Sequence, residues 1–199
     1  NNQLVNCNSI NSSSSNPATR SLTLGSSKIT LTSSSSSAFS IYNDNLAFDA
    51  GTSLISFTGN GSGLYVSTYF GNYTNFAFYD VEFTNSNGTS RLYYNNNYGN
   101  LSFNKVIFLS NGTMQCNATY DTLIFSPGRT YQLESNLTQT ITDEIIATGL
   151  GGFPIDIRST TSGIQAILSK ANGCVVLDFL QLRDNFATGG ASWYAGLNS

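Results

Sequence analysis

The chain has 199 residues and a formal net charge of −3, and only 10% of its residues are charged. Because soluble domains usually carry about 25% charged residues, solubility must come from Asn, Ser, Thr and Gly, as in secreted and surface proteins rich in β-structure. The chain lacks both the basic stripe that nucleic-acid binding needs and any run of roughly 18 apolar residues that could span a membrane as a helix.

The first half of the chain contains short alternating segments separated by Gly, Ser and Asn clusters. Residues 1–20 are polar and are predicted to form an N-terminal cap or linker, and residues 21–199 a single β-domain. Within the domain, Gly25–Leu31 is echoed by Gly51–Phe57 after a step of 26 residues, and Gly128–Leu133 is a shorter copy. Period-two alternation bounded by turn residues predicts strands.

A second phrase recurs at 78–83, 103–108, 120–125 and 177–182. An aromatic residue or Leu comes first, and the fourth and sixth positions are apolar, which is strand spacing. The positions expected to stack inward are Val81 and Phe83, Val106 and Phe108, Leu123 and Phe125, and Leu180 and Leu182. Coils of 17 to 26 residues fit an all-β, right-handed parallel β-helix. The alternative is an antiparallel β-sandwich, which favours strands every 8–12 residues and no repeated phrase.

The C-terminal third carries a more specific series of phrases. Asp121–Tyr131 leads into Thr138–Ile141, and Pro154–Ser159, Leu168–Gly173 and Leu177–Asp184 follow before Ala187–Gly196. This order resembles right-handed parallel β-helix segments of large secreted bacterial surface proteins, many of them adhesin-like and from Bacteroidetes and their relatives. The resemblance covers residues 121–196 well and residues 20–120 more loosely. It implies an extracellular or cell-surface location and brings no catalytic residues.

The chain departs from that resemblance after Trp193. Similar proteins continue with an Asn/Gly-rich loop and a last strand that contains Trp, whereas this sequence stops at Ser199. Either the chain was cut there or the last coil is open. We expect an open coil to be completed by a neighbouring module or subunit, because unpaired strand edges invite strand addition.

Carboxylate pairs are the main enzymatic alternative. The chain has no histidine, which excludes Ser-His-Asp and Cys-His catalysis and the usual catalytic zinc centre. Asp80, Asp121 and Asp178 occupy the second or third place of the repeated phrase and are the candidates to flank a glycosidic bond. Because Asn104 and Lys105 hold those places in another coil, we expect the carboxylates to end strands or face solvent. The sequence predicts no enzyme, no cofactor and no metal site.

The other charged residues are expected to have structural roles. A calcium ion in an oxygen-rich loop near Asp143 and Glu144, or near Asp44 and Asp49, is the alternative to an empty turn. Cross-coil ion pairs are expected among residues of the C-terminal coils, namely Arg158, Lys170, Asp178, Arg183 and Asp184.

Asn-x-Ser/Thr acceptors are the strongest modification signal. They occur at Asn11, Asn60, Asn72, Asn87, Asn100, Asn111, Asn117 and Asn136. A chain this rich in Asn, Ser and Thr also produces such triplets by chance. In the resembling bacterial proteins an Asp-Thr-Leu triplet can carry an O-glycan, which makes Thr122 a candidate, although its place inside a predicted strand argues against it.

The three cysteines cannot all pair within the chain. Cys7 and Cys116 lie in polar, Asn-rich surroundings and are the disulfide candidate, although nothing in the sequence fixes the distance between them. Cys174 lies in an apolar strand and is expected to be a buried thiol.

The tyrosines differ from the phenylalanines, which are expected to stack in the core. Residues 93–98 read as a polar aromatic loop suited to sugars or a protein partner, with a solvent-exposed insertion as the alternative. The candidate contact residues are Tyr93, Tyr94, Tyr98, Trp193 and Tyr194.

These observations together predict a non-catalytic structural or adhesive module of an extracellular fibre or filament. Its expected partners are neighbouring copies or modules of the same protein, with glycans as a further candidate partner. The alternatives are a β-helix protein that binds or degrades polysaccharides and a phage or viral fibre.

Overall fold

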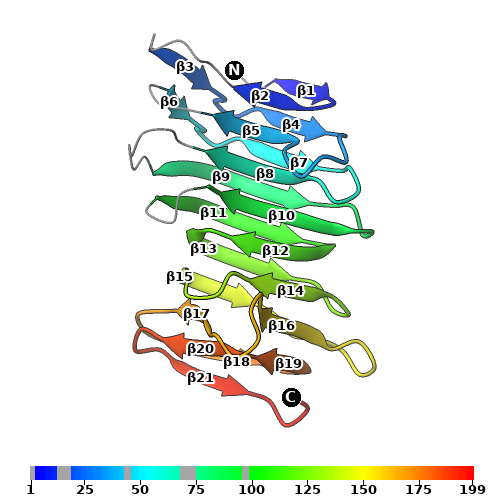
Figure 1. Cartoon of the computed structure of the whole chain (residues 1–199), viewed down its shortest axis with the longest axis vertical. Helices are drawn as coiled ribbons and strands as arrows, with labels where there is room; N and C mark the ends of the chain where they lie inside the picture. The colour runs from blue at the N-terminus through cyan, green and yellow to red at the C-terminus, as the bar shows by residue number, and fades with distance from the viewer. Residues whose placement is uncertain (1–2, 13–18, 43–45, 68–74, 96–98) are drawn as a thin grey trace.

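The chain winds into a parallel β-solenoid whose strands stack as successive rungs along the long axis (Figure 1). The structure is a computed structural model that describes residues 3–12, 19–42, 46–67, 75–95 and 99–199. These ranges contain strands and no helix, so the described chain has no helix able to cross a membrane. All pairings between the strands are parallel. The predicted β-helix is therefore confirmed, and the antiparallel sandwich is wrong.

Each rung has three sides, which we call faces 1, 2 and 3, and the chain visits them in that order. Face 3 is one eight-stranded sheet. It contains β2 (Ile10–Ser12), β5 (Phe39–Tyr42), β8 (Gly63–Ser67), β10 (Thr89–Tyr94), β12 (Asn111–Gln115), β14 (Thr130–Leu133), β16 (Ile155–Ser159) and β19 (Leu180–Arg183).

Faces 1 and 2 are joined in the middle of the molecule by long strands that bend at a corner. These are β9 (Phe76–Phe83), β11 (Asn100–Phe108), β13 (Asn117–Phe125) and β15 (Thr138–Ile146). Their first halves lie on face 1 with β3 (Arg20–Thr23), β6 (Leu46–Asp49), β17 (Ala166–Ser169) and β20 (Asn185–Thr188). Their second halves lie on face 2 with β1 (Leu4–Cys7), β4 (Lys28–Leu31), β7 (Leu54–Phe57), β18 (Cys174–Leu177) and β21 (Ser192–Ala195).

The solenoid includes part of the segment expected to be a cap. Strand β1 pairs with β4, and β2 pairs with β5. Residues 4–12 therefore already form a rung of the solenoid, and the boundary expected after residue 20 lies inside it.

Three of the four recurring phrases occupy equivalent places. Val81 lies beside Val106, and Val106 beside Leu123, in the shared register of β9, β11 and β13. The fourth phrase is not equivalent, because Leu177 ends β18 on face 2 and Leu180 begins β19 on face 3. The equivalent rung is β15, where a register shift after Tyr120 inserts an extra residue and disguises the pattern.

The copies of the glycine-led repeat are also not all equivalent in the structure. In β4 and β7, Ile29 lies beside Ile55 and Leu31 beside Phe57, whereas the third copy forms β14 on face 3. Gly51 has φ +56°, and a Cβ there would lie 2.3 Å from the backbone oxygen of Gly25. Glycine is therefore required where these two turns stack.

Aromatic stacks fill the interior, as expected of the phenylalanines. The rings of Phe57 and Phe83 have centroids 4.8 Å apart, and those of Phe83 and Phe108 are 4.7 Å apart. Seven of the eight predicted inward residues are buried. The exception is Leu182, which is 53% exposed because no further rung covers it.

Candidate functional site at the last rung

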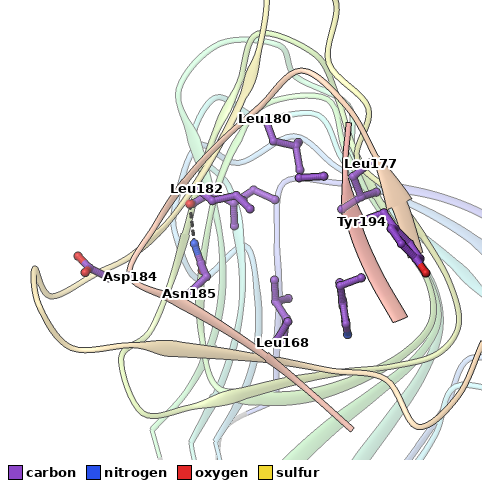
Figure 2. A pocket seen from close by; sticks show the side chains of 11 residues that line it. Leu168, Leu177, Leu180, Leu182, Asp184, Asn185 and Tyr194 are labelled. Atoms are coloured by element: carbon purple, nitrogen blue, oxygen red, sulfur yellow. Dashed lines mark hydrogen bonds between the residues drawn. The ribbon is translucent and has the colours of Figure 1, made fainter. Parts of the chain in front are cut away.

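A cavity of about 290 Å³ opens at the C-terminal end of the solenoid. Figure 2 looks into it and shows side chains converging from the sides of a roughly triangular rung. Face 1 contributes Leu168, Asn185 and Ala187, face 2 contributes Leu177 and residues 193–195, and face 3 contributes Ile157, Leu180 and Leu182. The cavity is the interior of the solenoid left open where the last rung is uncovered.

Two polar atoms lie unsatisfied in this largely apolar wall. Asn185 donates through Nδ2 to the backbone oxygens of Ile157 at 2.7 Å and Arg183 at 3.1 Å. Its Oδ1 is buried without a hydrogen-bond partner, as is the indole Nε1 of Trp193. Because buried polar groups are normally paired, these two atoms are exceptions in the wall of the last rung.

The carboxylates at this end of the molecule accept hydrogen bonds from residues in turns. Asp178 accepts hydrogen bonds from the side chain and backbone nitrogens of Asn198 at 3.0 and 3.1 Å and from the backbone nitrogen of Phe179 at 2.8 Å. These hydrogen bonds, the one from the Asn198 side chain foremost, lower the pKa of Asp178. Asp184 accepts from the backbone nitrogen of Gly163 at 3.1 Å.

The candidate catalytic carboxylates do not converge. Asp80 accepts a hydrogen bond from Asn104 Nδ2 at 2.7 Å and pairs with Lys105 at 3.7 Å. Asp121 lies two rungs further on, where it accepts from Thr142 Oγ1. Asp178 lies on a different corner, between β18 and β19. The matching positions of the phrase therefore form no carboxylate pair across a groove.

Asp49, named for the calcium alternative, and Lys170, named for the expected ion pairs, both hydrogen-bond to backbone atoms. No group of three or more Asp, Glu, Cys or His side chains gathers within the described ranges. Asp49 accepts from the backbone nitrogen of Gly51 at 2.9 Å, and Asp44 lies outside those ranges. Lys170 is buried and donates to the backbone oxygen of Asp143 at 2.5 Å instead of forming a cross-coil ion pair.

The ion pair observed in the C-terminal coils lies within one strand. Arg158 Nη1 lies 3.6 Å from a carboxylate oxygen of Asp156, two residues earlier in β16. The expected cross-coil pairing of the C-terminal charges is therefore wrong for the residues that the structure describes.

The glycosylation acceptors separate into two groups. Asn11, Asn60, Asn87 and Asn136 are exposed. The others among the described residues are half-buried at corners. The side-chain amide of Asn100 donates to Thr119 at 3.1 Å. The side-chain oxygens of Asn111 and Asn117 accept from backbone nitrogens of the next rung at 2.9 and 2.8 Å. Thr122 is half-buried within β13, and Asn72 lies outside the described residues.

The aromatic contact candidates are also divided by the fold. Tyr94 is 1% exposed and belongs to the core, because β10 continues through it where a loop was expected. Tyr93 points outward from the same strand, Trp193 lines the cavity and Tyr194 is 58% exposed. Tyr98 lies outside the described residues.

The cysteines do not form the expected disulfide, and all three are free. Cys7 ends β1, whereas Cys116 immediately precedes β13, five strands further along the sheet. At about 4.8 Å per strand, this exceeds the reach of a disulfide. Cys174, expected to be buried, is exposed because β18 turns Val175 and Leu177 inward instead.

Thiol reactivity should follow this placement. We expect a disulfide-exchange reagent at neutral pH to modify Cys174 first, Cys7 more slowly, and Cys116 only after unfolding. Burial raises the pKa of the Cys116 thiol to about 12, which removes the reactive thiolate. Peptide mapping after timed labelling measures the order, with Cys174→Ser as the control. Native labelling of Cys116, or a Cys7–Cys116 crosslink, would contradict the structure.

Comparisons with protein-family models, with curated proteins and with solved structures found no match for this chain. The interpretation of the site therefore depends on its own geometry.

Proposed function

We propose that the protein is a non-catalytic structural or adhesive module of an extracellular fibre, which associates with neighbouring copies or modules through its end rungs. The observation that carries this proposal is the open apolar cavity at the last rung. Leu182 at its rim is 53% exposed, whereas its register partner Ile157 in the preceding rung is fully buried. A further rung of strands would cover Leu182 in the way that each rung covers the one before it.

The opposite end of the solenoid also leaves an inward-facing apolar side chain partly exposed. Val5 lies in the inward column of Ile29 and Ile55 but is 36% exposed. A rung from a second copy supplies parallel strands, with hydrogen-bonding edges, on the same faces as the rungs within one copy. Stacking thus pairs strand edges and removes apolar surface from water, both of which favour association.

Sedimentation velocity over a range of protein concentrations tests the proposal. We expect the protein to form larger species as concentration rises, and Leu182→Asp to weaken association by at least about tenfold. An unpaired buried charge costs more than the roughly 1.4 kcal/mol that a tenfold change represents.

The matched control is Val176→Asp, because Val176 is 68% exposed on the outer side of β18. It adds the same charge near the same rung without entering the cavity and should leave association unchanged. Circular dichroism establishes that both variants are folded. Monomers at every concentration, or equal weakening by both variants, would contradict assembly through this end.

A further inference from the structure

The outer side of face 3 carries most of the arginines, although the chain as a whole is acidic. The strands of face 3 contain three of the five arginines in the sequence, Arg91, Arg158 and Arg183, and one acidic residue, Asp156. All three arginines lie in one outward column, which runs Arg91, Thr113, Gln132, Arg158, Arg183 across neighbouring strands. A strip with positive charge thus runs along a molecule whose formal net charge is −3.

Within this strip the positive charges are incompletely neutralised. Arg158 and Arg183 are direct neighbours on β16 and β19, and like charges facing each other across strands are destabilising. Arg158 has one carboxylate, Asp156, at 3.6 Å. Among the described residues Arg183 has no ion pair, and the Nε atoms of Arg91 and Arg158 are buried without hydrogen-bond partners. The exposed guanidinium of Arg183 is therefore available to pair with an external anion.

A tyrosine ladder adjoins the arginine column on the same face. The rings of Tyr65 and Tyr93 are stacked with centroids 4.8 Å apart, and those of Tyr42 and Tyr65 are 5.2 Å apart. The guanidinium carbon of Arg91 lies 4.4 Å from the centre of the Tyr93 ring, within the range of a cation–π contact. This contact holds Arg91 against the ladder and joins the aromatic and cationic parts into one surface.

We propose that this arginine–tyrosine face binds a linear carboxylated polysaccharide. Guanidinium groups recognise carboxylates through paired N–H donors, and tyrosines offer apolar ring surface together with hydroxyl groups for sugars. Arg158 and Arg183 lie on neighbouring rungs and Arg91 lies three rungs before Arg158, so the charges follow the solenoid axis as carboxylates follow a linear polysaccharide. This binding does not depend on whether copies stack end to end.

Binding to alginate, a polymer with one carboxylate per sugar, tests the proposal in a solid-phase assay at low salt. We expect the intact protein to bind alginate but not neutral dextran, and we expect binding to weaken as salt is added. The double variant Arg158→Gln/Arg183→Gln should bind at least about tenfold more weakly, a change of roughly 1.4 kcal/mol. Tyr65→Ala tests the aromatic part and should also weaken binding.

The matched control is Lys28→Gln/Lys105→Gln, which removes the same charge from face 2. It should bind alginate as the unaltered protein does. The proposal is overturned if alginate does not bind, if both double variants weaken binding equally, or if sulphated dextran or single-stranded DNA binds and alginate does not. Sedimentation velocity of the Arg158→Gln/Arg183→Gln variant shows whether it still assembles. Weaker alginate binding by a variant that assembles normally is then due to the lost arginines and not to lost assembly.

Discussion

Replacing Phe83 with alanine should lower the free energy of unfolding by about 3–5 kcal/mol, the usual range for a large aromatic residue in a packed core. Phe83 is 0% exposed and its ring lies between Phe57 and Phe108, with centroids 4.8 and 4.7 Å away. The small side chain leaves a cavity that two neighbouring rungs cannot close, because their strands are fixed by hydrogen bonds on either side. Urea unfolding monitored by circular dichroism measures the loss.

The control for this variant is Tyr79→Ala in the same strand. Tyr79 is 36% exposed on the outer side, so its loss should change stability by no more than about 0.5 kcal/mol. Similar losses for the two variants would show that the interior stack does not hold the rungs together.

Replacing Gln139 with leucine should lower the free energy of unfolding by about 2–6 kcal/mol. Gln139 is fully buried, accepts from the hydroxyl of Tyr120 at 2.7 Å and donates to the backbone oxygen of Cys116 at 2.8 Å. Leucine fills much of the space but leaves both partners buried and unpaired, at about 1–3 kcal/mol each. Urea unfolding again gives the magnitude.

A second substitution separates this hydrogen-bond effect from packing. Tyr120→Phe removes the orphaned hydroxyl, so the double variant Gln139→Leu/Tyr120→Phe should recover part of the loss. If the two losses simply add, the buried hydrogen bond between these side chains contributes little, contrary to its geometry.

The sequence predicted the class of fold because its evidence was local. The alternation in β9, β11 and β13 places Val81, Val106 and Leu123 in one buried column, and strand period alone specifies which side turns inward. Periodicity did not predict which face of the solenoid each segment occupies. The phrase at 177–182 has the same period but crosses a corner, and periodicity does not record where the chain turns.

The C-terminal end of the solenoid was expected to be open, but the unpaired polar atoms in its wall were not predicted. Asn185 looks like a turn residue in the sequence, and only the fold places its amide between strands with Oδ1 unpaired. Tyr94 was misplaced for a similar reason, because six residues rich in Tyr and Asn resemble a loop unless the register with β8 is known. The arginine column also depends on strand pairing across nearly 100 residues of sequence.

The three-sided rungs also determine how the molecule carries mechanical load. The strands run across the long axis, so the hydrogen bonds between rungs point along it (Figure 1). At most interfaces the tension between the two ends is shared by the hydrogen bonds of all three faces, but among the described residues no strand pairing joins β6 to β9 on face 1 or β15 to β18 on face 2. Every rung contacts only its immediate neighbours. The tension that the solenoid withstands is therefore set by its weakest interface and not by its length.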